Sequence, residues 1–231
     1  MLKEKAEYIL TGILGFFFCL CVMLIIKDIV NYRIAEKEYA DLKAGSKQEE
    51  RDQKQSDRTD RFPDSVSYPE EKDYFDRLYD INHDLVCILT IPSLEISYPV
   101  VQGSDNERYL NYTFEGKKNP AGCLFMDYEN DRTFSDHNTF IYGHNMKDGS
   151  MFGRLKQMTK EGFDKAATKA YITTKEGSNR YKFESIQIVD INSYNAKDPG
   201  TKDLLTLYTC WGNNKSRRLL VTFSKEDNGF P

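Results

Sequence analysis

Cys210 and Arg218 are the residues of this chain whose types and spacing could support chemistry. Alternating apolar positions predict a strand over 204–209 that delivers Cys210 at its end. Arg218 opens a second predicted strand, 218–223, after a polar turn. The two strands would set a thiol beside a permanent cation. Taken alone, such a cysteine is more often a disulfide half or a small core residue than a nucleophile.

A histidine ends another apolar run. Residues 139–142 lead into Gly143-His144-Asn145-Met146, and Met151-Phe152-Gly153 follows shortly afterwards. A glycine before the histidine lets the backbone approach its neighbours closely, so the imidazole can face a cleft at the mouth of a strand. A lone histidine in this position would more often be structural.

Together these stretches resemble the sortases, the cysteine transpeptidases of Gram-positive cell surfaces. The resemblance rests on Ile-Tyr-Gly-His-Asn-Met with Met-Phe-Gly, then Thr-Leu-Tyr-Thr-Cys, and an arginine before an aliphatic strand. The resemblance covers roughly residues 68–223, and the sequence around His144 is similar to that of class B members.

The resemblance implies acyl transfer through a covalent thioester. Cys210 would be the nucleophile, His144 would move the proton of the leaving and incoming amines, and Arg218 would donate to the oxyanion. Adjacent Arg217 is the rival, because neighbouring residues of a strand point to opposite faces. We choose Arg218 because the family's arginine directly precedes the aliphatic residues, as Arg218 precedes Leu219.

The family's activity also implies substrates and partners. The substrate would be a secreted protein with a C-terminal sorting signal, typically Asn-Pro-x-Thr-x in class B, cut after the Thr. The acceptor would be an amine of a peptidoglycan precursor or a pilin lysine. Tyr142, Asn145 and Thr209 are expected to contact the substrate, although Thr209 could equally be an ordinary β-branched strand residue. No cofactor or nucleic acid is expected.

The other histidines and cysteines have simpler explanations. His83 follows a predicted helix, where a cation complements the helix dipole, and His137 lies in a polar loop. The histidines and cysteines lack the close paired spacing of metal ligands, so we predict no metal site. Cys87 and Cys123 fall in predicted strands, and with Cys210 they give an odd number that argues against a disulfide framework, although a Cys87–Cys123 bridge stays open.

The N-terminus is predicted to anchor the chain in the cell membrane. Residues 8–26 form an uncharged apolar run about 28 Å long as a helix, enough to cross the hydrocarbon core. The small-residue cleavage site of a signal peptide is missing after it. The expected organisation is a cytoplasmic N-terminus and signal anchor over 1–32, a charged solvated stalk over 33–67, and an extracellular catalytic domain over 68–231.

The predicted fold is mainly β, an eight-stranded sortase-type barrel with a few short helices after the transmembrane helix. A helix is expected to begin at Pro69, and short helices over 106–112 and 152–158. Short strands separated by turns indicate a closed or nearly closed barrel. They are expected at 85–91, 95–101, 122–128, 139–142, 170–174, 181–190, 204–209 and 218–223. A net charge of −4 gives no basic face for nucleic acid.

Two departures from class B members keep an alternative open. Only residues 196–203 stand where many members carry a long helical insertion that helps to form the substrate groove, and Gly212 replaces an acidic residue of some members. The alternative is therefore a catalytically impaired, membrane-tethered barrel that binds cell-wall or sorting-signal peptides. A papain-like hydrolase is disfavoured, because there the cysteine precedes the histidine and lies on a helix.

Overall fold

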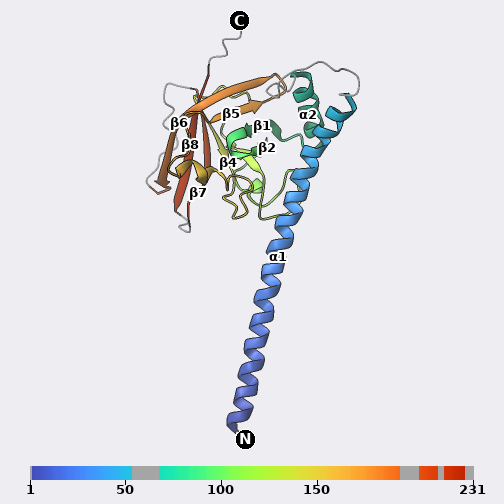
Figure 1. Cartoon of the computed structure of the whole chain (residues 1–231), viewed down its shortest axis with the longest axis vertical. Coiled ribbons are helices and arrows are strands. Elements are labelled where there is room, and N and C mark those ends of the chain that lie inside the picture. Colours follow the sequence, from blue (N-terminus) through green and yellow to red (C-terminus); the bar gives the residue numbers. More distant parts are fainter. Residues whose placement is uncertain (1, 54–67, 193–202, 213–215, 227–231) are drawn as a thin grey trace.

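The computed structural model describes residues 2–53, 68–192, 203–212 and 216–226. Eight β-strands within these residues close into a barrel in the order β1-β2-β3-β4-β7-β8-β6-β5, which confirms the predicted fold class (Figure 1). The strands are β1 Leu85–Ile91, β2 Ile96–Val101, β3 Leu124–Met126, β4 Asn138–Tyr142, β5 Lys169–Thr173, β6 Ser178–Asp190, β7 Leu204–Cys210 and β8 Arg217–Lys225.

The barrel mixes parallel and antiparallel pairs. β2 pairs with β3, and β4 pairs with β7, in parallel, while the other neighbours are antiparallel. Parallel pairing of β4 and β7 puts the carboxyl ends of both strands at one edge of the sheet. The antiparallel β8 begins at this same edge, beside the end of β7.

Alternation along the strands separates a core face from an outer face. In β7 the side chains of Leu205, Leu207 and Thr209 are buried, and in β8 those of Leu219 and Val221. Cross-strand partners share a face of a sheet, so the residues between them share the outer face of the barrel, on which Thr206 and Leu220 are also buried. The period-2 pattern thus fixes which side chains can meet outside the barrel.

One helix precedes the first strand of the barrel, and short 3₁₀ segments connect some of the strands. α2, Tyr68–Ile81, begins one residue before the expected Pro69 and buries Phe75 and Leu78. The two short helices expected between strands are single 3₁₀ segments, η2 Arg108–Leu110 and η3 Leu155–Thr159. A further 3₁₀ turn, η1 Pro92–Leu94, joins β1 to β2.

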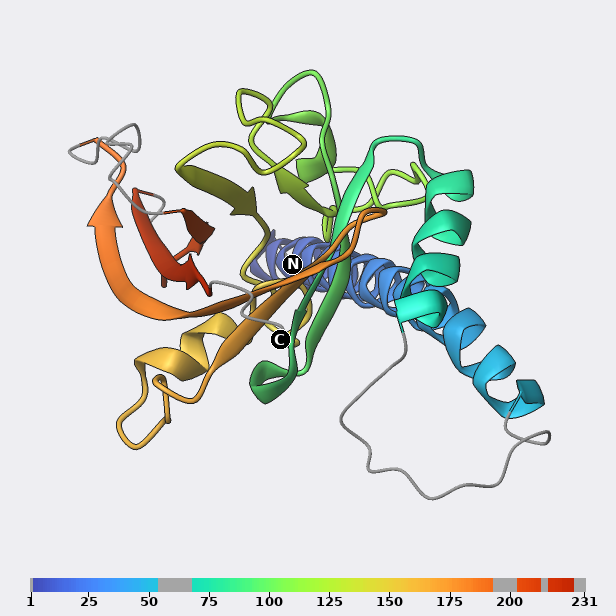
Figure 2. The ribbon, with the colours of Figure 1, turned by 90° about the horizontal axis from the view of Figure 1, so that it is seen from above.

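α1, Leu2–Gln53, is one continuous helix whose two halves have different surroundings. Its first half extends away from the barrel, and its second half runs along the barrel wall beside α2 (Figures 1 and 2). Large apolar side chains are exposed along it from Leu10 to Ile34. The helix is long and apolar enough to cross a membrane and is a candidate span.

The second half of α1 differs from the solvated stalk expected over 33–67. Ala35, Glu38, Tyr39 and Leu42 are buried against the barrel. Their spacing of i, i+3, i+4 and i+7 is one face of a helix, so a narrow stripe is enough to dock it despite the charged composition. Residues 54–67 lie outside the described part of the chain, and the division at 32/33 and 67/68 stays a prediction.

Replacing isoleucine with alanine should lower the free energy of unfolding more at a buried position of the barrel than at an exposed one. Ile141 of β4 is 0% exposed and Ile188 of β6 is 40% exposed. Ile141→Ala should lower the free energy of unfolding by about 2–5 kcal/mol, because it leaves a cavity in a closed core. Ile188→Ala should cost about 1 kcal/mol or less. Urea titration of the chain in detergent micelles, followed by near-UV circular dichroism, measures both, and equal losses would contradict the barrel interior described here.

Candidate active site

The ends of β4 and β7 are joined by hydrogen bonds around His144. The last register pair of the two strands is Tyr142 with Tyr208. Beyond it, the Gly143 N–H donates to the Tyr208 carbonyl at 3.2 Å, and the Asn145 side-chain amide donates to the Cys210 carbonyl at 2.9 Å. His144 therefore stands between two residues that are each bonded to the end of β7, the end that carries the exposed Cys210.

Gly143 is required by packing at this point. A Cβ on residue 143 would lie 2.3 Å from Cδ2 of Leu124 and 2.7 Å from a ring carbon of Phe152, and both of these side chains are fully buried. Only a residue without a side chain lets the backbone pass between them. The glycine before the histidine thus brings the imidazole up to the sheet edge.

Arg218 lies opposite Cys210 in the β7–β8 register. Directly opposed residues of an antiparallel pair project from the same face, so the guanidinium and the thiol share the outer face of the barrel. Arg217 is one residue away and projects from the other face, where it is paired in register with Asp190 of β6. The register therefore favours Arg218 over its rival as the neighbour of the thiol.

Two tyrosine rings, those of Tyr142 and Tyr208, lie on this outer face next to Arg218. The rings of Tyr142 and Tyr208 meet edge to face with centroids 5.0 Å apart, and the Arg218 guanidinium carbon lies 5.9 Å from the Tyr208 centroid. The Tyr142 hydroxyl donates to Asp127 at 2.7 Å. Burial, followed by this bond, raises the pKa of Tyr142 far above its usual value, so it stays a neutral donor. Tyr208 was missed from the sequence, although it stands two residues before Cys210 on the same strand face.

The imidazole of His144 has a fixed partner. Its Nε2 lies 2.8 Å from the carbonyl oxygen of Leu110, at the end of η2. A carbonyl can only accept, so Nε2 carries the proton and Nδ1 is the nitrogen left to exchange one. Sequence reasoning could not find Leu110, because a backbone carbonyl has no residue signature.

All three expected substrate contacts have polar groups that are engaged within the protein, that of Tyr142 with Asp127 as described above. The buried hydroxyl of Thr209 donates to the Gly143 carbonyl at 2.7 Å, on the core side of β7. The Asn145 amide holds the Cys210 carbonyl. Both bonds tie β4 to β7, and only Tyr142 of the three lies on the same strand face as Cys210.

The remaining histidines lie elsewhere. His83 packs against the ring of Tyr79 at 4.9 Å, just past α2. His137 lies 3.6 Å from Asp203, at the opposite end of β7 from Cys210. Six residue steps of a strand separate those ends by about 20 Å.

The residues on which the predictions about the substrate groove rest lie only partly within the described part of the chain. Residues 193–202 lie outside the described part, and so does most of the short 196–203 segment. Gly212 is exposed at a φ of +62°, so the position two after Cys210 offers no carboxylate in this chain.

A family model for the sortase domain matches residues 89–226, more than half of the chain and all of the strands that carry this site. The chain belongs to the sortase family. A Listeria monocytogenes protein named Sortase B is 46% identical to it over 94 residues, which are 41% of this chain and 38% of that protein. The match therefore spans well under half the length of this curated relative.

Solved structures similar to this sortase are class B members. The crystal structure of sortase B from Bacillus anthracis in complex with AAEK2 is 30% identical, covers 67% of this chain and 83% of that one, and gives a TM-score of 0.59. A Streptococcus pyogenes class B sortase involved in pilus biogenesis is 27% identical, covers 66% of this chain and 97% of that one, and also gives 0.59. These similarities confirm the predicted class.

The sortase should show two grades of thiol reactivity among the three cysteines of its barrel. Cys87 and Cys123 are free but buried, and burial raises the pKa of the Cys87 thiol far above its usual value and that of Cys123 to about 12. Cys210 is exposed. Iodoacetamide should therefore alkylate Cys210 in the folded chain and spare the other two from pH 7 to 9, because their thiolates form only at much higher pH.

Peptide mapping by mass spectrometry after the reaction measures this order, and alkylation in denaturant is the control that exposes all thiols. Modification of Cys87 or Cys123 at the same rate as Cys210 in the folded chain would contradict it.

Proposed function

We propose that this chain is a cysteine transpeptidase that cuts a sorting signal in secreted proteins and passes the acyl group to an amine. The observation that carries the proposal is the outer-face pair of Cys210 and Arg218 at the sheet edge where His144 follows the end of β4. A nucleophile, a permanent cation and a proton carrier are the groups that acyl transfer through a thioester requires.

In the first half-reaction, the Cys210 thiolate attacks the carbonyl carbon of the residue before the scissile bond. The carbonyl electrons move to oxygen, and the Arg218 guanidinium donates hydrogen bonds to the oxyanion. The C–N bond then breaks, and imidazolium His144 gives its Nδ1 proton to the departing amine. The products are a thioester on Cys210, a free amine and a neutral His144.

In the second half-reaction, the nitrogen of an acceptor amine attacks the thioester. Neutral His144 takes the proton from that nitrogen at Nδ1, while Nε2–H stays bonded to the Leu110 carbonyl. The C–S bond breaks, the new amide leaves, and Cys210 returns as a thiolate beside the imidazolium. The same histidine nitrogen therefore serves both proton transfers.

The class B similarity supports a sorting signal of the Asn-Pro-x-Thr-x type, cut after the Thr, in this proposal. The acceptor is an amine of a peptidoglycan precursor or a pilin lysine. The similarity to a class B sortase involved in pilus biogenesis supports the pilin lysine as an alternative. We further propose that the apolar half of α1 anchors the chain in the cell membrane with the barrel on the extracellular face.

The first test is whether Cys210 forms an acyl adduct. The full chain in detergent micelles is incubated with Asn-Pro-x-Thr-x and Leu-Pro-x-Thr-x peptides, with glycine oligopeptides and a lysine amide as acceptors. Mass spectrometry should detect a thioester on Cys210 and a transpeptidation product, and neither with Cys210→Ala. Peptide binding without adduct or turnover, in a chain whose Cys210 still alkylates, would favour a barrel that only binds peptides.

The second test separates the two arginines. Arg218→Gln should lower kcat by about 10²–10³-fold, because it removes a donor to the oxyanion. Arg217→Gln, the same change one residue earlier and on the other strand face, should stay within a few-fold of the parent. Equal losses in both variants, with unchanged thermal unfolding, would contradict the role given to Arg218.

A further inference from the structure

Tyr39 of α1 lies between the two segments that flank His144. It is buried where the second half of α1 runs along the barrel. One of these segments is the loop 109–122, which contains Leu110, and the other is the turn 145–152 that follows His144. Tyr39 contacts the first segment directly and the second through one intervening ring.

The first connection passes through Gly122. The Tyr39 hydroxyl donates to the Gly122 carbonyl at 2.9 Å. Gly122 has a φ of +61°, and a Cβ there would lie 2.5 Å from the carbonyl oxygen of Tyr109 and 2.9 Å from that of Leu110. Gly122 therefore packs directly against the peptide whose carbonyl oxygen holds His144 Nε2. Three contacts, through Gly122 and Leu110, therefore connect the hydroxyl of Tyr39 to the imidazole.

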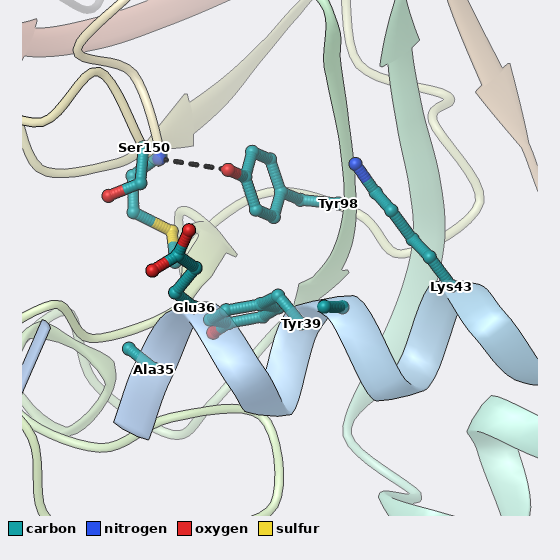
Figure 3. A pocket seen from close by; sticks show the side chains of 8 residues that line it. Ala35, Glu36, Tyr39, Lys43, Tyr98 and Ser150 are labelled. Carbon is teal, nitrogen blue, oxygen red and sulfur yellow. Dashed lines mark hydrogen bonds between the residues drawn. The ribbon is translucent and has the colours of Figure 1, made fainter. Parts of the chain in front are cut away.

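The second connection passes through Tyr98 of β2. The Tyr39 and Tyr98 rings meet edge to face at 5.3 Å, in the cavity between α1 and the barrel (Figure 3). The Tyr98 hydroxyl accepts from the Met151 N–H at 3.3 Å, the dashed line in Figure 3. Met151 pairs with Asn145 in an isolated bridge, and the next N–H, of Phe152, donates to the His144 carbonyl at 3.0 Å.

Neighbouring α1 residues hold the same loop. The Glu38 carboxylate is 5% exposed and accepts from the Thr113 hydroxyl and the Glu115 N–H, each at 3.0 Å. The Asn31 carbonyl accepts from the Asn119 side chain at 2.9 Å. With Tyr39, these bonds fix the 109–122 loop to α1 at separate points along its length, so the loop and the helix are positioned together.

We propose, on the basis of the acyl-transfer function above, that Tyr39 is a positioning residue for His144. Through Gly122 it fixes the Leu110 carbonyl, which keeps the proton of the neutral imidazole on Nε2 and leaves Nδ1 for the reaction. The simpler explanation is that Tyr39 only fills space between α1 and the barrel. That explanation predicts a loss of stability on mutation and no change at the imidazole.

Tyr39→Phe in the full chain in detergent micelles separates the two explanations, because it keeps the ring and removes only the hydroxyl. We expect kcat for transpeptidation to fall about 10-fold with KM within twofold, since the general acid–base contribution of a histidine is worth about 10²–10⁴-fold and only its orientation is loosened. Tyr32→Phe is the matched control, the same change on the same helix at a partly buried ring.

The second readout does not depend on turnover. Selective ¹⁵N labelling gives signals from three histidines, and His144→Gln identifies the signal of interest. The shifts of its two ring nitrogens at high pH give the tautomer populations of the neutral form. In the parent chain and Tyr32→Phe the Nε2–H tautomer should dominate, and in Tyr39→Phe the Nδ1–H share should rise at least twofold.

Each outcome decides the proposal. An unchanged tautomer ratio and kcat in Tyr39→Phe, even with a lower melting temperature, would overturn it and leave Tyr39 as a packing residue. If the parent chain performs no transpeptidation, the acyl-transfer function fails, while the tautomer measurement still decides whether Tyr39 orients the imidazole. Tyr98→Phe, which removes the acceptor of the Met151 N–H, tests the second connection in the same way.

Discussion

The parallel pairing of β4 and β7, with antiparallel β8 on the other side of β7, is the constraint on which the site depends. Parallel strands end together, and an antiparallel neighbour begins where they end. This arrangement alone brings His144, Cys210 and Arg218 to one edge, although they come from three separate stretches of chain. The two-residue period of the strands then selects the face, which separates Arg218 from Arg217.

Hydrogen bonds from residues around Cys210, and not from its thiol, hold the ends of β4 and β7 together. Hydrogen bonds donated by the Gly143 N–H, the Asn145 amide and the Thr209 hydroxyl join β4 to β7, and the Leu110 carbonyl accepts from the imidazole. These groups are satisfied within the protein, which leaves the thiol of Cys210 exposed at the surface. A site of this kind is ordered before a substrate arrives, as electrostatic stabilisation of an oxyanion requires.

Much of this could be predicted from the sequence, and the failures have physical causes. Alternating apolar residues predicted β7 and β8, and the glycine before His144 indicated a close backbone approach, which the fit of Gly143 between two buried side chains explains. The docking of α1 was missed because its second half is rich in charged residues, and only a narrow stripe including Tyr39 is buried. The Leu110 carbonyl was beyond sequence reasoning, since every residue has one.

α1 runs without a break from its apolar half to the barrel. The helix therefore fixes both the distance and the rotation of the barrel relative to that apolar half. Thirteen residues separate Ile26 from Tyr39, so with the apolar half in a bilayer the docking point stands about 20 Å farther along the axis. Each residue of a helix also turns by about 100°. Adding one residue to this stretch would swing the barrel around the axis, whereas a disordered tether would absorb the change. With α1 as the membrane anchor that we propose, the end of the barrel that carries Cys210 and His144 would keep one direction relative to the membrane plane.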